Sequence, residues 1–284
     1  MNKGVAVVTG ASRGAGQGIA RALGAAGYTV YVTGRSQTPD ASPLGGTIHQ
    51  TAAEVTAAGG RGIAYACDHA DDEAVRNLFA TVEREEGRLD ILVNNAAAIS
   101  NDLIQRGPFW TRPVRMADII TVGLRSSYIA AHAAAPLLTA KPGGLIVFTS
   151  APGAVNYAHG PAYGSQKAGT DKMSADMAVD LRPFGAASVS IWMGLLKTAR
   201  SAASMAEKPG QFDFLLPYME SPDFTGRIIA AIHNDPNMME LSGRTLIGAE
   251  IAKEYGILDI DGSSPASLRP VVGGPYKYSE RIID

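Results

Sequence analysis

Short apolar runs alternate with longer segments of helical pattern along most of the chain. The runs are rich in β-branched residues and are nearly continuous in hydrophobicity, which is typical of strands buried on both faces of a parallel sheet. An α/β fold is therefore expected, with helices on both faces of a doubly wound parallel sheet, in a three-layer α/β/α sandwich. The runs are Val5–Val8, Thr29–Val32, Gly62–Tyr65, Ile91–Val93, Leu145–Phe148 and Ser188–Ile191.

The segments between these runs carry signals for helix ends. A helix from Gly18 to Ala26 follows a Gly-rich turn, and acidic residues from Asp71 begin a helix that reaches Glu85. Arg182–Pro183 closes a long helix that begins near Ala162. Strands that alternate with helices in this order predict right-handed crossovers and a ligand crevice beyond the carboxyl ends of the strands.

The length fits one large domain with a terminal extension. We expect residues 1–250 to form a single Rossmann-type catalytic domain and residues 251–284 to pack on this domain or on a neighbouring subunit. Residues 198–223 are too apolar for a solvated linker and suit a loop over the substrate. An ordinary packed helix pair explains this segment equally well.

Composition excludes several classes of protein. The formal charge is −2 and the sequence has no long Lys/Arg run, so no basic surface for nucleic acid or for an acidic membrane is expected. The single cysteine, Cys67, forms no intrachain disulfide and no cysteine metal cluster, so no metal is expected. The first residues lack a signal-peptide pattern and no apolar stretch is long enough to span a bilayer, so we expect a soluble, cytoplasmic protein.

A Gly-rich turn follows the first strand and opens the first helix. This context favours a dinucleotide site, because glycines permit a tight turn and the free N–H groups at the helix start attract a pyrophosphate. The residues that we expect to contact the cofactor here are Gly10, Ser12, Arg13, Ala15 and Gly16.

Arg35 stands nineteen positions after Gly16, where a fold selective for NAD carries an acidic residue for the adenosine ribose. No carboxylate precedes Asp40, and Arg13 and Arg21 are further cations in this stretch. A ribose 2′-phosphate would meet guanidinium groups without repulsion. The sequence therefore predicts NADP(H) in preference to NAD(H).

Tyr163 and Lys167 lie four residues apart in the predicted long helix and so share one of its faces. A nearby ammonium stabilises a phenolate, so Lys167 is expected to lower the pKa of Tyr163 and make it a general acid or base. Ser150 follows the fifth strand, where its hydroxyl would bind a carbonyl oxygen beside them. Taken singly, such a serine more often satisfies a turn.

Together these motifs resemble the short-chain dehydrogenase/reductase family from Val5 to about Gly248. The resemblance implies that Asp68 holds the adenine and that Lys167, with Tyr163 beside it, also binds the nicotinamide ribose. By the same likeness Asn95, with Ala96 and Ala97, lines the cofactor cleft. A segment containing Gly194, Leu196 and Thr198 would fold over the carboxamide. Residues 241–244 and 259–262 resemble one branch of the family, whose members reduce carbonyl compounds with NADPH.

Three positions depart from the family pattern. Gly123, forty residues before Tyr163, stands where many members carry an asparagine that supports a proton-relay water. Met193–Gly194 replaces the usual Pro-Gly, and Ala97 replaces the last glycine of Asn-Asn-Ala-Gly. The relay is therefore in doubt, whereas the proton donor is retained.

These residues predict an oxidoreductase that interconverts a carbonyl and a secondary alcohol. Phe109, Trp110, Trp192 and Met193 suit an apolar pocket for a bulky ketone or aldehyde, although core packing explains them nearly as well. The rivals are a catalytically silent NADPH-binding sensor and, less strongly, an enoyl reductase or a sugar epimerase. His159 is expected to be solvated or to satisfy a turn rather than to be catalytic. The resemblance further implies a homodimer or homotetramer built on helices around residues 117–138 and 162–181.

Overall fold

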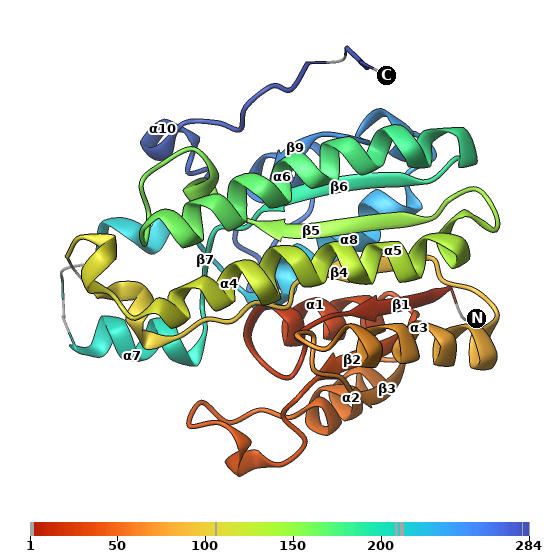
Figure 1. Ribbon diagram of the computed structural model, residues 1–284, viewed down its shortest axis with the longest axis horizontal. Helices are drawn as coiled ribbons and strands as arrows, with labels where there is room; N and C mark the ends of the chain where they lie inside the picture. Colours follow the sequence, from red (N-terminus) through yellow and green to blue (C-terminus); the bar gives the residue numbers. More distant parts are fainter. Residues whose placement is uncertain (1–2, 106, 208–209, 211–212, 280, 284) are drawn as a thin grey trace.

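A seven-stranded parallel sheet forms the centre of the computed structural model, which describes residues 3–105, 107–207, 210, 213–279 and 281–283 (Figure 1). Its strand order is β3-β2-β1-β4-β5-β6-β9, and every neighbouring pair is parallel. The doubly wound fold expected from the sequence is confirmed. The strands are β1 (Val5–Val8), β2 (Thr29–Gly34), β3 (Arg61–Ala66), β4 (Ile91–Asn94), β5 (Leu145–Ser150), β6 (Ala187–Trp192) and β9 (Thr245–Ile247).

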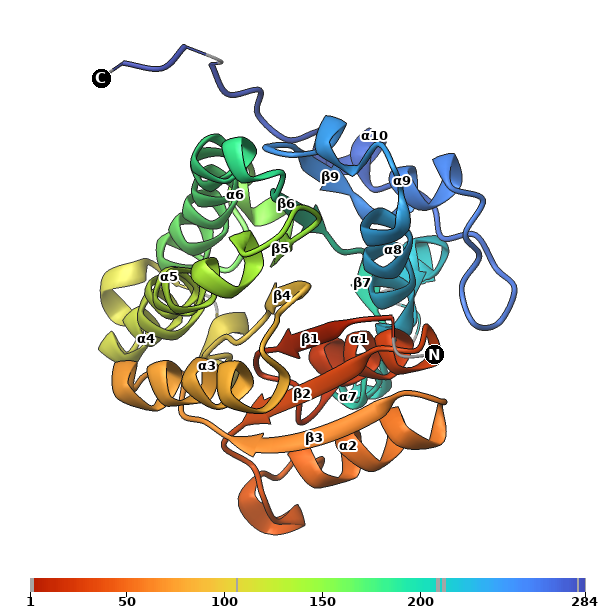
Figure 2. The same cartoon turned by 90° about the vertical axis from the view of Figure 1, so that its right-hand side faces the viewer.

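Helices cover both faces of this sheet, so that the molecule has three layers (Figure 2). Each face has its own apolar core, one built around Ile19, Val55 and Ile228 and the other around Leu78, Phe79 and Leu138. The first layer holds α1 (Gly14–Ala25), α2 (Ile48–Ala57), α8 (Pro222–Asn234) and α9 (Gly248–Glu254). The second holds α3 (Asp72–Glu86), α4 (Asp118–Ile120), α5 (Ser126–Thr139) and α6 (Pro161–Leu181).

Two features of the fold differ from the sequence-based expectation. The three-residue strand β9 was not predicted, because its run is too short to stand out as a buried strand. Residues 198–223 form α7 (Ala199–Glu207), a 3₁₀ segment (Asp213–Tyr218) and the short strand β8 (Met219–Glu220), and so are not a plain helix pair. Phe212, one of the apolar residues of this segment, lies outside the described residues.

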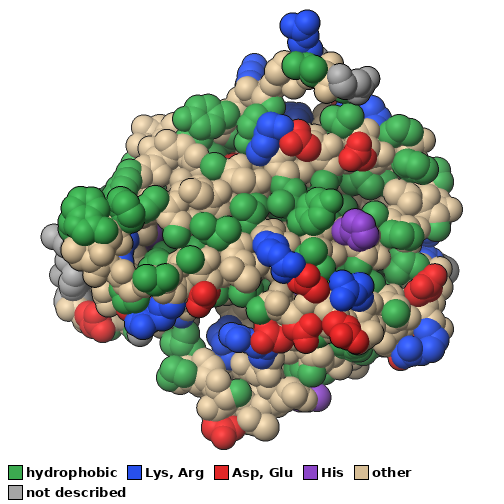
Figure 3. Space-filling view, in the orientation of Figure 1, with side chains coloured by type: hydrophobic (Ala, Val, Ile, Leu, Met, Phe, Trp, Pro, Cys, Tyr) green, Lys and Arg blue, Asp and Glu red, His purple; other side chains and the backbone are tan. Residues whose placement is uncertain are grey.

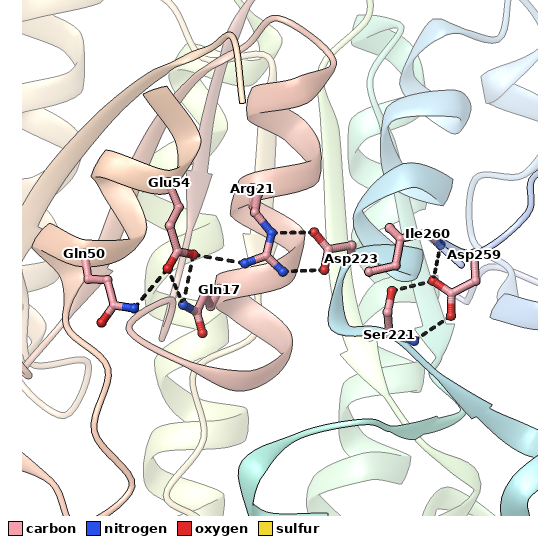
Figure 4. Close-up of polar contacts among 8 residues, drawn as sticks. All are labelled: Gln17, Arg21, Gln50, Glu54, Ser221, Asp223, Asp259 and Ile260. Carbon is pink, nitrogen blue, oxygen red and sulfur yellow. Dashed lines mark hydrogen bonds and ion pairs between the residues drawn. The ribbon is translucent and has the colours of Figure 1, made fainter. Parts of the chain in front are cut away.

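One guanidinium ties three helices together near the crevice (Figure 4). Arg21 on α1 makes a bidentate ion pair with Asp223 on α8, with contacts of 2.7 and 2.5 Å, and a 3.0 Å ion pair with Glu54 on α2. Asp223 is buried, so the paired arginine offsets the cost of burying its charge. The beginning of α8 is thereby held against the helix that carries the Gly-rich turn.

Apolar side chains gather on the face formed by α4, α5 and α6 (Figure 3). They include Ile120, Tyr128 and Val179, which are exposed by 37 to 49%. The expected association of copies through these helices stays a prediction. Among the described residues no helix is long and apolar enough to cross a membrane, and no group of three or more metal-binding side chains comes together.

Candidate active site

The Gly-rich turn lies at the carboxyl end of β1 and requires its glycines. Gly10 and Gly14 have φ of +65° and +57°, which favours glycine. A Cβ at Gly10 would lie 2.7 Å from the Cα of Ala96, and one at Gly16 would lie 2.5 Å from the Nδ2 atom of Asn95. Around Gly14 nothing lies within 4 Å of such an atom, so the turn is open at that point. The backbone is thus shaped for close approach of an anion.

Thr9 and Asn95 join the loops after β1 and β4. The Thr9 hydroxyl accepts hydrogen bonds from the backbone N–H groups of Asn95 (2.8 Å) and Ala96 (3.0 Å). In return, the Asn95 amide donates to the carbonyl oxygens of Thr9 (2.9 Å) and Gly10 (3.2 Å). Asn95 therefore helps to shape the Gly-rich turn.

Three arginines lie near enough to interact electrostatically: Arg13 after β1, Arg35 after β2 and Arg200 in α7. Burial lowers the pKa of Arg13, and repulsion from Arg200 and Arg35 lowers it further. Arg13 donates to the buried Ser36 hydroxyl at 2.6 Å, and Arg35 lies 3.8 Å from Asp68, which follows β3. Arg200 and Ser36 were not singled out from the sequence. Mutual repulsion makes this cluster a favourable site for an anion.

Tyr163 and Lys167 share one face of α6, as their spacing predicts. The Lys167 Nζ atom lies 5.7 Å from the centroid of the Tyr163 ring and donates to the carbonyl oxygen of Thr149 at 3.2 Å. The Tyr163 ring lies so close to Gly153 that a Cβ there would be 2.4 Å from its Cε1 atom. Phenol and ammonium are therefore adjacent, at the carboxyl end of β5.

The expected direction of the Tyr163 pKa shift is wrong for this structure. Burial raises the pKa of Tyr163 to about 12, and burial lowers that of Lys167 to about 8. Both shifts have the same cause, since a buried side chain resists being charged. Tyr163 is thus a neutral phenol near pH 7, which suits a proton donor.

A buried carboxylate lies one helical turn beyond Lys167. Asp171 accepts hydrogen bonds from the Ser190 hydroxyl at 2.6 Å and from the Trp192 indole N–H at 2.8 Å. Burial raises the pKa of Asp171, and these two donors, the Ser150 hydroxyl and Lys167 act against that rise. The network joins α6 to β5 and β6, and sequence analysis missed it.

Ser150 occupies the position expected of it, and its hydroxyl points toward α6. It is the last residue of β5, is 0% exposed, and its Oγ atom lies 3.5 Å from the Lys167 carbonyl oxygen. The hydroxyl is drawn toward Asp171 because a buried carboxylate needs donors. Its expected role in binding a substrate oxygen stays a prediction.

Gln166 occupies the space where a side chain at position 123 would lie. A Cβ at Gly123 would be 3.0 Å from the Cγ and Cδ atoms of Gln166, within a π-helical turn (Thr121–Arg125). The Gln166 amide donates to the Gly123 carbonyl oxygen at 3.0 Å. An asparagine at 123 would therefore require Gln166 to move. This is a steric reason for glycine at 123 in place of the asparagine of the family pattern.

His159 lies against the catalytic candidate rather than only closing a turn. Its ring packs edge-on against Tyr163, with centroids 5.1 Å apart, and its φ of +59° is uncommon for a residue with a Cβ. Burial lowers the pKa of His159, so its ring is neutral near pH 7. Phe109 and Trp110, in contrast, are 60% and 74% exposed and pack edge-on against each other, so core packing does not explain them. Their place in a pocket wall stays a prediction.

Glu220 is a buried carboxyl group beside the loop after β6. That loop contains Gly194, Leu196 and Thr198, and its strand β7 (Leu195–Leu196) pairs with β8. Burial raises the pKa of Glu220 to about 7, against the lowering effect of the Gly194 amide and the Thr225 hydroxyl. Its Oε2 atom has no hydrogen-bond partner, and a Cβ at Gly194 would lie 2.6 Å from it. Only glycine fits there.

Replacing Glu220 with glutamine is expected to stabilise the protein by an amount that grows from about pH 5 to about pH 8. The folded protein keeps this proton up to a pH of about 7, whereas the unfolded chain loses it near 4.5. Stability from this group therefore falls as pH rises through that window, and glutamine has no proton to lose. The difference in unfolding free energy should reach about 1 to 3 kcal/mol at the alkaline end.

Thermal and denaturant unfolding of both proteins across this pH range measure the difference. The exposed Glu240→Gln variant is the matched control and should follow the wild type. A Glu220→Gln effect that stays constant with pH would contradict the prediction.

Fold and site together define a nucleotide-binding oxidoreductase of the α/β class. A family profile described as short chain dehydrogenase matches residues 4–209. The chain therefore belongs to the short-chain dehydrogenase/reductase family, whose members use a nicotinamide cofactor.

Comparison with individual proteins shows which members of the family this chain is similar to. It is 40% identical over 269 residues to mouse (Mus musculus) dehydrogenase/reductase SDR family member 1, covering 91% of this chain and 83% of that protein. The human (Homo sapiens) protein of the same name is 40% identical over 273 residues, covering 92% and 85%. Both proteins belong to the branch of the family whose sequence pattern is found in residues 241–244 and 259–262 of this chain. A short chain dehydrogenase from Mycobacterium thermoresistibile shares the fold with a TM-score of 0.77, at 26% identity over 94% of this chain and 92% of that one.

Proposed function

We propose that this protein is an NADPH-dependent reductase of apolar ketones or aldehydes, with Tyr163 as the proton donor. One observation carries the proposal, namely the Tyr163 phenol beside the Lys167 ammonium at the carboxyl end of β5. The Gly-rich turn after β1 lies along the same edge of the sheet, where ligands of doubly wound folds bind. The reaction class follows from this juxtaposition together with the family.

The residues present fit a phosphorylated dinucleotide. Gly10, Gly14 and Gly16 leave room at the helix start for a pyrophosphate, where a side chain would collide or strain the turn. Arg13 and Arg35, with the Ser36 hydroxyl, would hold a ribose 2′-phosphate, and this supports NADPH over NADH. When bound, the nicotinamide supplies the hydride. We extend to Asp68, Asn95–Ala97 and residues 194–198 the contacts that the family likeness implies.

The chain's own groups handle the proton. The neutral Tyr163 hydroxyl donates to the substrate oxygen, which becomes an alcohol, and the nearby Lys167 ammonium stabilises the phenolate left behind. Asp171 opposes the loss of the Lys167 proton, because a carboxylate raises the pKa of a neighbouring ammonium. Ser150 would orient the substrate oxygen after its hydroxyl turns from Asp171 toward the cleft.

A turnover screen tests this proposal. NADPH and NADH are each supplied with a panel of small diketones, quinones, aldehydes and bulky aryl ketones, and consumption of the cofactor is followed by absorbance. We expect steady turnover with NADPH that favours apolar substrates. Tight NADPH binding without turnover across the whole panel would favour a silent sensor and overturn the proposal.

A further inference from the structure

Helix α6 buries a run of polar side chains in its middle. Figure 1 shows α6 lying along β5 and β6. Charged side chains are almost never fully buried unless they are paired, so this run needs partners on neighbouring elements. At its far end the Ser174 hydroxyl lies 3.0 Å from that of Ser188 on β6, so polar contacts as well as apolar packing hold the helix to the sheet. The buried polar residues are Gln166, Lys167, Thr170, Asp171 and Ser174.

Asp171 accepts the strongest hydrogen bonds of this run, because its carboxylate is charged. One of its oxygens accepts from the Ser190 hydroxyl at 2.6 Å and the other from the Trp192 indole N–H at 2.8 Å. All three side chains are at most 3% exposed, so bulk water is not an alternative partner for them. The two donors therefore fix the carboxylate in position and orientation.

Lys167 places a second buried charge one helical turn before Asp171. Its Nζ atom donates to the carbonyl oxygen of Thr149, a neutral group that does not by itself offset the cost of burying an ammonium. Burial lowers the pKa of Lys167 to about 8, and the Asp171 carboxylate acts through space against that fall. Each charge thus stabilises the other where neither is stable alone.

The contacts of Asp171 also reach the ends of two strands. Trp192 is the last residue of β6 and pairs in register with Ser150, the last residue of β5. The Ser150 hydroxyl acts together with Ser190 and Trp192 to stabilise the carboxylate, which lowers the Asp171 pKa against the effect of burial. One carboxylate therefore joins the helix that carries Tyr163 to the strand ends beside it.

We infer that Asp171 is a positioning residue of the active site, which anchors α6 to the ends of β5 and β6 and supplies the negative charge that the buried Lys167 ammonium requires. The inference rests on the proposed function, in which this ammonium stabilises the Tyr163 phenolate. Asp171 acts through Lys167 and through the fixed geometry of α6. Removing its charge should therefore change the proton affinity of Lys167 in a way that a purely structural role would not.

The other titratable groups facing this pair keep their charge state in the pH range of interest. Tyr163 lies on the same face of α6, and Tyr278 lies in the segment after α10 (Arg269–Val272). Burial raises the pKa of Tyr163 to about 12. Burial, and then repulsion from Asp171 and Asp176, raise that of Tyr278 to about 12 as well. Both phenols are neutral where Lys167 titrates.

An NMR titration of Lys167 in the full-length protein tests the inference. Lysine is labelled with ¹³C at Cε, the Lys167 signal is assigned by its loss in Lys167→Met, and the wild-type midpoint should lie near pH 8. Asp171→Asn keeps the shape of the side chain, and its amide can still accept from Trp192 and donate to Ser190. Because the counter-charge is lost, the midpoint should fall by about 1 pH unit or more.

Asp176→Asn is the matched control. It removes the same charge from the same helix, at an exposed position that pairs with Lys172, and should leave the Lys167 midpoint at the wild-type value. The inference fails if Asp171→Asn leaves the midpoint unchanged. It fails equally if both variants move the midpoint by the same amount.

Unfolding measurements cover the case in which Asp171→Asn folds poorly. That variant leaves a buried ammonium without its partner, whereas the double variant with Lys167→Met buries no unpaired charge. The double variant should fold even if Asp171→Asn alone does not, and the losses in denaturant midpoint should be less than additive. Additive losses, or a double variant that fails to fold as well, would show that Asp171 does not act through Lys167.

Kinetics separate this inference from the proposed function. In the wild type kcat/KM for carbonyl reduction should fall as Lys167 loses its proton, and in Asp171→Asn that fall should begin at lower pH, in step with the NMR midpoint. A shifted NMR midpoint without turnover of any carbonyl would defeat only the reductase proposal. Turnover that depends on Tyr163, with an unshifted midpoint, would defeat only the present inference.

Discussion

Replacing Tyr163 with phenylalanine is expected to lower kcat/KM for carbonyl reduction by about 10³-fold. The change removes one hydroxyl and leaves the ring, so packing on Gly153 and His159 is retained. Loss of the proton donor acts on the transition state, and kcat should fall with kcat/KM. Steady-state kinetics measure the loss, and NADPH affinity, measured by fluorescence titration, should stay within about twofold of wild type.

Tyr157 provides the control for this substitution. It lies in the loop before α6, six residues from Tyr163, but is 80% exposed, and Tyr157→Phe should be fully active. If Tyr163→Phe retains more than about a tenth of wild-type turnover, the proton comes from elsewhere. The neighbouring His159 would then be the first residue to examine.

Replacing Arg35 with leucine should weaken the preference for NADPH about 10- to 100-fold, through a rise in KM for NADPH with KM for NADH nearly unchanged. Arg35 is exposed and its contact with Asp68 is long, so its guanidinium is available to a 2′-phosphate. Removing it also relieves the repulsion of Arg13, which limits the loss of stability.

The measurement is kcat/KM for both cofactors with one ketone. Arg84→Leu, which removes a similarly exposed arginine of α3, serves as the control and should keep the wild-type ratio. An unchanged ratio in Arg35→Leu, or a wild type that uses both cofactors equally, would contradict the assignment of the 2′-phosphate site.

The features that the sequence predicted well are those with short-range signals. Six central strands were found because each contains a short apolar run; five of them, such as β1 and β5, are fully buried, whereas the edge strand β3 is only partly buried. The pairing of Tyr163 with Lys167 follows from helical geometry alone, and the Gly-rich turn follows from its place between a strand and a helix.

The remaining features depend on contacts between distant parts of the chain. No local sequence signal predicts that Glu220 is buried against Gly194. Likewise, the hydrogen bonds between Ser221 and Asp259 join residues that are 38 positions apart in the chain. The direction of the Tyr163 pKa shift could not be predicted either, since burial causes the shift and is decided by the whole fold. Ser150 was found in sequence, but its rotamer is set by Asp171.

The hydrogen bonds between Thr9 and Asn95 have a consequence for the thermodynamics of cofactor uptake. They fix the Gly-rich turn against the loop after β4 through groups of the chain itself. A dinucleotide that enters such a preorganised cradle loses little of its interaction energy to ordering the backbone. Calorimetric titration with NADP⁺ should accordingly show a heat-capacity change no larger than the contact surface itself accounts for, without the excess that accompanies coupled folding.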